Sequence, residues 1–142
     1  MAVTNSVLVN DGGAPARILN FEAAEAITAG TALEINASGQ VKMADTVDEL
    51  VAGFALVDAA SGALCSVVTG SGILLNVHLD GTADIAAGDM LEVGADGALL
   101  LSANETDASS IAIALEIATD TSAIHANVAL NGGVQLFKVL VK

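Results

Sequence analysis

Apolar and polar residues alternate along much of the chain, beginning at Leu33. In residues 33–43 the apolar side chains can face one side and the polar side chains the other, a period of two that is typical of β-strands. The sequence Asn-Ala-Ser-Gly at residues 36–39 separates two such runs and predicts a hairpin turn. Residues 51–57 are almost continuously apolar, which favours a strand buried on both faces.

Further apolar or alternating runs, separated by turn-forming residues, predict strands at residues 64–69, 73–79, 90–93, 98–101, 111–117, 124–130 and 135–141. Strands that recur about every 8–12 residues, with turns between them, are typical of an all-β barrel or sandwich. Residues 21–29 are the one segment where helix formers compete. We expect a strand there, because the corresponding segment at residues 82–87 has no helical composition.

The segment at residues 27–41 returns at residues 85–99, and the chain is organised around this repeat. The matched pairs are Ile27 and Ile85, Gly30 and Gly88, Leu33 and Leu91, Glu34 and Glu92, and Gly39 and Gly97. The match continues with residues 53–56 against 112–115, and residues 63–64 against 123–124. A solenoid needs at least about three repeats. Two copies therefore predict one domain over residues 21–142, with pseudo-equivalent halves at about residues 21–80 and 81–142.

The period of two also predicts which side chains are buried. The expected core positions are Leu33, Ile35, Phe54, Leu56, Leu91, Val93, Ile113, Leu115 and Phe137. Replacing Leu56 or Leu115 by Ala is then expected to destabilise the fold by roughly 2–5 kcal/mol.

Residues 1–20 are expected to form an extended N-terminal arm that contributes little to the core. Their apolar residues alternate poorly, and a cluster of turn formers ends in Pro15, the only proline of the chain. An extended segment can bind a partner by adding main-chain hydrogen bonds to an exposed sheet edge. The candidate binding residues of the arm are Val7 and Val9, which are suitably spaced for such binding, Pro15, and Arg17, which is placed to pair with a carboxylate of the partner. A frayed terminus is the alternative.

The net charge of −13 arises from 17 acidic and only 4 basic residues. Nucleic-acid binding and anionic membrane surfaces both require clustered Lys and Arg, so we expect neither partner. No apolar run approaches the roughly 18 residues of a membrane span, and the N-terminus lacks the features of a signal peptide. With 3 Phe and no Trp or Tyr, little aromatic bulk remains for a deep ligand pocket or a base-stacking surface.

Candidate catalytic and metal-binding residues are few, and we expect no catalytic site, cofactor or metal. His78 and His125 lack the nearby carboxylates or cysteines of a typical metal site. Cys65 lies in an apolar run that is typical of a buried, inert thiol. Ser71 lies between two glycines without the spacing of a nucleophile elbow or a phosphate loop.

Two sets of acidic residues leave alternatives open. The residues Asp45, Asp48, Glu49, Glu105 and Asp107 fall in two matching loops, where a calcium site is the alternative to solvated charge. Glu34 and Glu92 recur at equivalent positions. Paired carboxylates act in glycoside hydrolysis when they lie about 5–9.5 Å apart, but a repeat also duplicates outward-facing charges that have no such role.

The segments 29–35 (Ala-Gly-Thr-Ala-Leu-Glu-Ile), 51–56 (Val-Ala-Gly-Phe-Ala-Leu) and 70–73 (Gly-Ser-Gly-Ile) follow one another in this order. In this rhythm the chain resembles bacteriophage head decoration proteins, also called capsid cement proteins, of the lambda head-stabilising type. The resemblance implies a small β-rich body that assembles as a homotrimer on the outside of a capsid, with the major capsid protein as its partner and no catalysis. The length and the duplication of this chain depart from the lambda type.

The sequence therefore predicts an all-β protein, with a small antiparallel barrel or sandwich body, an internal pseudo-duplication and an extended N-terminal arm. Its expected function is to stabilise a phage head from the outer surface of the virion, after synthesis in the cytoplasm of a bacterial host. A host- or glycan-binding fibre or adhesin module is the alternative, although the chain lacks the Trp and Tyr that such a module would expose. A hydrolase that uses Glu34 and Glu92 is a second alternative.

Overall fold

The computed structural model describes residues 2–3, 7–10, 17–45, 50–79, 84–102, 110–117, 133–134 and 137–142. The strands of the first part are β1 (Ala2–Val3), β2 (Leu8–Asn10), β3 (Arg17–Glu22), β4 (Ala32–Ile35), β5 (Val41–Met43), β6 (Gly53–Ala55) and β7 (Leu64–Thr69). Those of the second part are β8 (Leu74–Val77), β9 (Met90–Val93), β10 (Leu99–Leu101), β11 (Ala112–Ala114), β12 (Gly133–Val134) and β13 (Phe137–Val141), with a short 3-10 turn, η1 (Ala95–Gly97), between β9 and β10.

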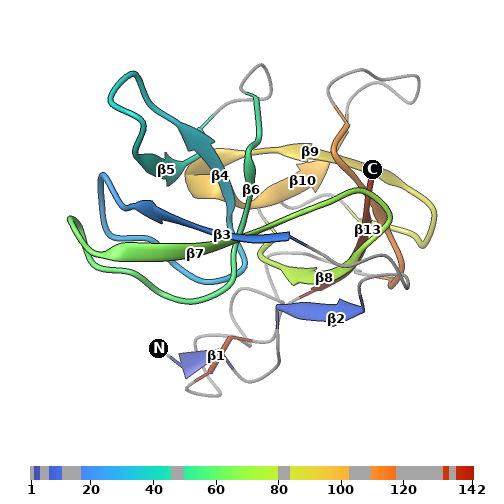
Figure 1. The fold of residues 1–142 in the computed structure, drawn as a ribbon. Helices are drawn as coiled ribbons and strands as arrows, with labels where there is room; N and C mark the ends of the chain where they lie inside the picture. Colours follow the sequence, from blue (N-terminus) through green and yellow to red (C-terminus); the bar gives the residue numbers. More distant parts are fainter. Residues whose placement is uncertain are drawn as a thin grey trace.

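The strands form two main antiparallel sheets, which confirms the predicted all-β class (Figure 1). The first sheet has the order β3-β7-β6-β4-β5, and the second has the order β10-β9-β11-β13-β8-β2. A separate two-stranded parallel sheet joins β1 to β12. The predicted strand at residues 51–57 appears as β6, whose three residues are all buried, as expected of a strand covered on both faces.

The two sheets repeat the same arrangement of strands. The order β5-β4-β6-β7-β3 in the first corresponds to β10-β9-β11-β13-β8 in the second. The register agrees as well, because Leu33 lies opposite Met43 and Gly53, and Leu91 lies opposite Leu101 and Ala112 at the equivalent places. Identical strand order is the outcome that a duplicated fold requires.

The limits of the two halves differ from those expected. Because β3 corresponds to β8, and β7 to β13, the halves span residues 17–69 and 74–141. The sequence match of residues 63–64 with residues 123–124 was therefore wrong, since the strand equivalent to β7 is β13, which lies further along the chain. The strand predicted at residues 124–130 lies outside the described residues.

The hydrophobic core has two clusters of unequal size. The smaller lies within the first half and contains Ala23, Ile27, Leu33, Val41, Ala55, Cys65 and Val67. In the second half, the equivalent positions belong to the larger cluster, which also takes up the other face of the first sheet through Ala32, Phe54 and Val68. The central part of the first sheet, in β4, β6 and β7, is therefore buried on both faces, and the second half packs against one of them.

Most predicted core positions are confirmed, with two exceptions. Leu33, Phe54, Leu91, Val93 and Phe137 are buried, and Leu56 and Ile113 are partly buried. Ile35 and Leu115 were wrongly predicted, since they are 48% and 38% exposed. Ile35 ends β4 and Leu115 follows the end of β11, so the period of two runs past the covered part of each strand. The large destabilisation expected for Leu115→Ala therefore does not apply.

The region where a helix competed, residues 21–29, is not helical, and the predicted strand is confirmed only at residues 21–22, since bends and a turn follow. Phe21 and Glu22 complete β3, and Ala23 and Ile27 each form an isolated β-bridge, with Val41 and Ala59. The segment cannot form helical bonds there, because the backbone of Ala23 and Ile27 is hydrogen-bonded to residues 59–63, in the connection between β6 and β7.

The described parts of the expected arm lie in the sheets. β2 pairs with β8, and β3 pairs with β7 along its whole length. Val7 is buried in the larger cluster, and its carbonyl accepts the Asn76 N–H at 2.7 Å. The expectation that residues 1–20 contribute little to the core was therefore wrong for Val7.

Candidate functional surfaces

The acidic residues singled out by the repeat have separate structural partners. Glu34 on β4 forms an ion pair with Lys42 at 2.8 Å across the β4–β5 ladder. Glu92 is buried on β9 and accepts a hydrogen bond from the Ser102 hydroxyl at 3.1 Å. Each carboxylate is thus engaged within its own sheet, which accounts for their recurrence as part of a duplicated ladder.

Lys42 joins two acidic side chains on the surface of the first half. Besides Glu34, it contacts Asp45 at 3.3 Å. Hydrogen bonds to Glu34 and then to Asp45 raise the pKa of Lys42 above its usual range. Asp45 is the one member of the two predicted acidic loops that the structure describes; the loop residues Asp48, Glu49, Glu105 and Asp107 lie outside the described residues. A calcium site there stays an untested prediction.

The other candidate reactive residues are placed as structural residues. Cys65 is a buried free cysteine on β7, and burial raises the pKa of its thiol. This is the inert environment that the apolar run predicted. Ser71 lies exposed in the turn between β7 and β8. His78 is partly buried just after β8, and His125 lies outside the described residues. Within the described part of the chain, no group of three His, Cys, Asp or Glu side chains is placed to hold a metal ion.

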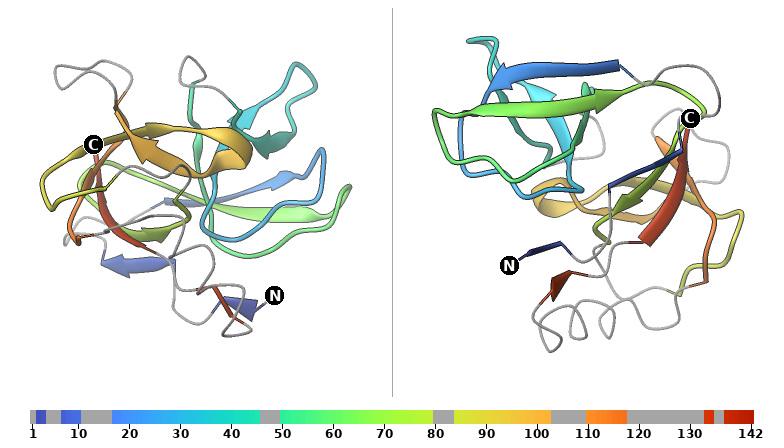
Figure 2. Two further views of the ribbon diagram at one scale, coloured as in Figure 1. Left: turned by 180° about the vertical axis from the view of Figure 1, so that it is seen from behind. Right: turned by 60° about the horizontal axis from the view of Figure 1, so that its bottom comes forward.

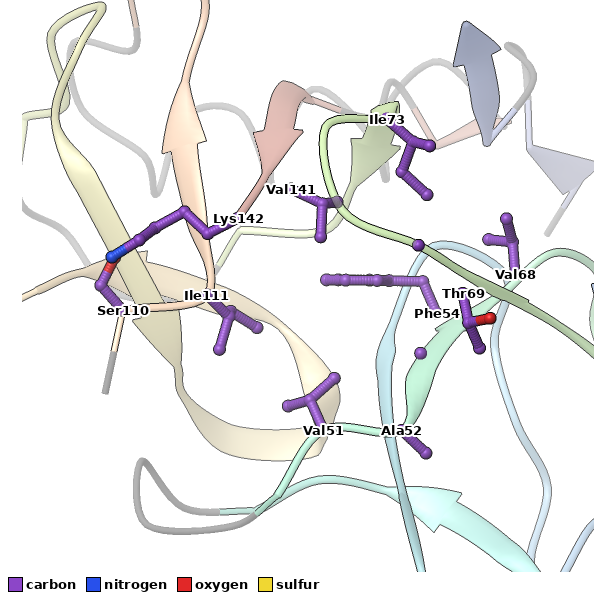
Figure 3. Close-up of a pocket in the computed structure, with 12 residues that line it drawn as sticks. Val51, Ala52, Phe54, Val68, Thr69, Ile73, Ser110, Ile111, Val141 and Lys142 are labelled. Carbon is purple, nitrogen blue, oxygen red and sulfur yellow. The ribbon is translucent and has the colours of Figure 1, made fainter. Parts of the chain in front are cut away.

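A cavity of about 210 Å³ lies where the two halves meet (Figure 3). Its walls come from equivalent segments, residues 51–54 and 68–70 of the first half and residues 110–111 and 141–142 of the second. Phe54 reaches across it toward Ile111 and Val141. Its lining is largely apolar, and its titratable side chain, Lys142, contacts the Ser110 hydroxyl at 3.4 Å. Apart from this Ser110–Lys142 contact, the lining has no pair of titratable or nucleophilic side chains.

A second cavity, of about 440 Å³, is formed where the β9–β10 turn meets the first half. Its lining residues are Thr28, Thr31, Met43, His78, Ala95, Asp96 and Ala98. Asp96 has a positive φ of 53°, and the next residue, Gly97, donates its N–H to the Ala44 carbonyl at 2.7 Å. The turn is thereby fixed against β4 and β5.

The residues predicted to bind a capsid are in different situations. Arg17 is exposed at the start of β3, where a partner can reach it. The Val7 side chain is taken up by the core. Val9 lies in β2, but its side chain is outside the described part of the structure, as is the whole of Pro15. Of the four, the exposed Arg17 is the one that the described structure leaves available for contact.

Sequence reasoning missed the exposed apolar edge made by β3. Ile18 and Leu19 are 51% and 47% exposed on this strand. Leu64, at the beginning of the neighbouring β7, is 71% exposed. The signal was present in the run Arg-Ile-Leu-Asn-Phe-Glu at residues 17–22, which has strand-forming residues on both faces. Its first four residues fall in the predicted arm, which obscures their place at the edge of a sheet.

Comparison with known proteins identifies a similar fold. A solved structure of the base of a bacteriophage phi29 head fibre (gp8.5, N base) aligns with a TM-score of 0.65 and 18% sequence identity. The alignment covers 90% of this chain and 95% of the phi29 chain. At this level of identity, the likeness is one of fold. No protein-family model matches the sequence, and no curated protein matches it significantly. Among the described residues, none belongs to a helix with the length and hydrophobicity to span a membrane.

Proposed function

We propose that this chain is a structural protein of a phage head, bound to the outer surface of the shell through contacts with the major capsid protein. The observation that carries the proposal is the likeness, over nearly the whole of both chains, to the base of a phage head fibre. The described residues support a non-catalytic role, because Glu34, Glu92 and Cys65 have structural environments in the sheets.

A structural protein on the outside of a phage head can be a cement protein or the base of a fibre. A cement protein binds across boundaries between shell subunits and raises the stability of the shell, as the resemblance to lambda-type decoration proteins implies. The second form is the base of a head fibre, as the phi29 protein is described; such a base would attach a fibre to the head without raising the stability of the shell. The alternative of a host- or glycan-binding module also fits a fibre, and is tested alongside.

The test uses heads that lack this chain, to which the purified protein is added. Co-sedimentation with heads, together with a higher temperature of head disruption, is expected for a cement protein. Co-sedimentation without any gain in head stability indicates a fibre base. Failure to bind heads, combined with binding to host cells or to isolated surface glycans, contradicts the proposal and favours the adhesin alternative.

The contribution of the N-terminal segment to head binding is best tested at Arg17. Deleting residues 1–16 also removes Val7 from the core and β2 from the edge of β8, so lost binding would be confounded with lost folding. Arg17→Glu leaves these contacts in place, because Arg17 is exposed. We expect it to weaken head binding if Arg17 pairs with a shell carboxylate. The charge-matched control is Lys142→Glu, at the other end of the chain; it also removes the contact with the Ser110 hydroxyl, so circular dichroism checks that it is folded. Equal binding by both variants contradicts a role for Arg17.

A further inference from the structure

Three of the four outer edges of the two equivalent five-strand arrangements are covered by the chain itself. At β5, Ala24 donates its N–H to the Val41 carbonyl at 2.8 Å. At β10, the Leu99 N–H donates to the His78 carbonyl at 2.9 Å. At β8, the added strand β2 completes the sheet. The fourth edge is β3, and no strand among the described residues pairs with its outer side.

β3 has few of the features that protect sheet edges from pairing with other chains. Natural edges are usually short, bulged, or interrupted by Lys or Pro. β3 has six residues in an unbroken register with β7, and its residues 18–21 are uncharged. The right-hand view of Figure 2 shows it at the outer margin of its sheet, with β7 on its inner side. Such an edge is suited to accept another strand.

The equivalent edge in the second half shows how this position is covered. Leu19 on β3 corresponds to Leu75 on β8, since each lies opposite a matching valine, Val67 and Val139. Leu75 lies opposite Leu8 of β2 and is fully buried, whereas Leu19 is 47% exposed. The difference in exposure is therefore associated with β2, which lies beside β8 and has no counterpart beside β3 among the described residues.

The backbone of β3 presents its hydrogen-bonding groups in the right places. In antiparallel pairs, residues alternate between bonding to one neighbour and to the other. Ala23 donates its N–H to the Ala63 carbonyl at 2.8 Å on the inner side, so residues 21 and 19 also bond inward. Ile18 and Asn20 then point outward, as Asn76 does at the equivalent place on β8, where it donates to Val7.

We propose that β3 pairs in antiparallel orientation with β3 of a second copy of this chain, across a twofold axis. A twofold axis keeps the faces of both sheets aligned, so each residue lies opposite a residue of its own face. The favoured register places Leu19 opposite Leu19 of the second copy and Ile18 opposite Asn20. The Ile18 and Asn20 backbone groups then form hydrogen bonds on both sides of the axis.

The next register, shifted by one residue in each chain, is less favourable. It places Ile18 opposite Glu22 of the second copy. The Glu22 carboxylate already accepts a hydrogen bond from the Gln40 side chain at 2.7 Å in its own chain, and moving it against an apolar residue costs solvation. The favoured register leaves Glu22 beyond the paired residues, places Arg17 opposite Phe21 at each end and buries Leu19 at the centre, so it gains apolar contact without moving the Glu22 carboxylate.

A second copy fits this edge because the strand is complementary to itself. Its centre is uncharged, with the apolar Ile18 and Leu19 beside Asn20, and its outward backbone groups offer matched donors and acceptors about the axis. The charge of −13 per chain opposes association, but this repulsion is long-ranged and is screened by salt. The contact closes at two copies, which differs from the expected trimer, and it does not depend on the proposed head-binding function.

Disulfide trapping tests the register directly. In a non-hydrogen-bonded antiparallel pair the facing Cβ atoms lie about 4.5–5.5 Å apart, near the reach of a disulfide bond. Leu19→Cys is therefore expected to form a covalent dimer under mild oxidation. The matched control is Leu64→Cys, which is also exposed but lies on β7, behind the edge. The unmodified chain is a second control, since its one cysteine is buried. A covalent dimer from Leu64→Cys and none from Leu19→Cys overturns the proposal.

Sedimentation equilibrium of the unmodified chain gives an independent measurement. We expect a monomer–dimer equilibrium that shifts toward dimer as salt is raised. Leu19→Lys is expected to weaken the dimer by about tenfold or more, which corresponds to roughly 1.4 kcal/mol, while Leu64→Lys leaves it unchanged. Circular dichroism checks that both variants are folded. A monomer at all salt concentrations, or a trimer that is insensitive to Leu19→Lys, contradicts the proposal.

Discussion

The two halves of this chain have the same strand order but different cores. Ala23, Val41 and Cys65 of the first half correspond to Leu79, Leu99 and Phe137 of the second, as the paired bridges and registers show. The small residues build a cluster of their own, whereas the large ones join a core that extends to the first sheet. The same strand arrangement therefore holds small side chains in one half and large ones in the other, because the small ones form a separate cluster and the large ones pack into the shared core.

The two sheets also differ in how far their other face is buried. The first sheet is covered on one face by its own small cluster and on the other by the second half. In the second half, Met90, Ile113 and Leu140, which correspond to the buried Ala32, Phe54 and Val68, are only partly buried. The second half thus acts as the larger structural core, and the first half is completed by packing against it.

The largest effect is expected from the pair Phe137 and Cys65, which occupy equivalent positions. Phe137→Ala should destabilise the protein by about 3–5 kcal/mol, because it leaves a large cavity in the main core. Cys65→Ala removes a single sulfur atom from the small cluster and should cost clearly less. Chemical denaturation of both variants measures the difference. Equal costs would contradict the claim that the second half provides the dominant core.

The hairpin turns of the two halves give the next contrast. Gly39 and Gly97 are equivalent, with φ of 79° and 72°. A side chain at Gly39 would meet no atom within 4 Å, whereas a Cβ at Gly97 would lie 2.6 Å from the Ala32 carbonyl oxygen. The first turn is open to solvent, and the second is packed between the halves.

Replacing each of these glycines by Ala separates backbone strain from packing. Both variants adopt a left-handed conformation that costs an L-residue roughly 1–2 kcal/mol. Gly97→Ala must also displace the backbone of β4, and overpacking of this kind costs a further 1–3 kcal/mol or so. Denaturation midpoints should therefore fall much further for Gly97→Ala than for Gly39→Ala. Similar losses would mean that the second turn is not held against the first half.

The two turns also differ in what stabilises them from within. The Asn36 side-chain oxygen accepts the N–H groups of Ser38 and Gln40, at 2.9 and 3.0 Å. The equivalent residue of the second half is Gly94, which has no side chain, and that turn is held by the Gly97 bond to Ala44 instead. Asn36→Gly should therefore destabilise the first half by about 1–2 kcal/mol, since each net hydrogen bond contributes about 0.5–1.5 kcal/mol.

Amide hydrogen exchange measures the effect of Asn36→Gly. Asn36→Gly should increase exchange at Ser38 and Gln40 while exchange in the second turn stays the same. Gly39→Ala serves as the matched control, because it strains the same turn and leaves the Asn36 hydrogen bonds in place. An unchanged exchange rate at Gln40 would show that the open turn is stable without its side-chain bonds.

The sequence predicted the features that repeat locally, and it failed where the structure depends on distant contacts. The Leu33–Leu91 match located the two hairpins correctly, because turn glycines and strand alternation are local signals. It could not locate the strand equivalent to β7 in the second half, since β13 has the same position in its sheet but little similarity in sequence. Nor could it show that Val7 is buried, because its neighbour Asn76 lies far along the chain.

The candidate surface was less predictable than the fold. The charge and the absence of Trp and Tyr can be read from the sequence, but edge exposure depends on which strand lies outermost. Ile18 and Leu19 have the same character as the partly buried Leu74 and the buried Leu75 of β8. Leu75 has β2 as its outer neighbour, and β2 belongs to the segment predicted to be a separate arm. No strand among the described residues has this place beside Leu19.

The smallest expected effect is a pH dependence confined to alkaline conditions, and it again distinguishes Cys65 from Phe137. Burial raises the pKa of the Cys65 thiol in the folded protein, whereas an unfolded cysteine titrates near its ordinary value of about 8.5. Between these two values the unfolded chain binds fewer protons than the native one, so stability falls as pH rises. Below the unfolded value the thiol is protonated in both states, and its contribution to stability is fully present.

Denaturation of the unmodified chain and of Cys65→Ala, at about pH 7 and about pH 10, measures this contribution on either side of the ordinary thiol pKa. Other groups titrate equally in both proteins, so the unmodified chain should lose more stability between the two pH values than Cys65→Ala does. A thiol reagent should also modify Cys65 far more slowly in the folded protein than in denaturant, because the thiolate is the reactive form. Equal rates in the two conditions would show that the small cluster opens readily, and that the first half is held in place mainly by the core of the second.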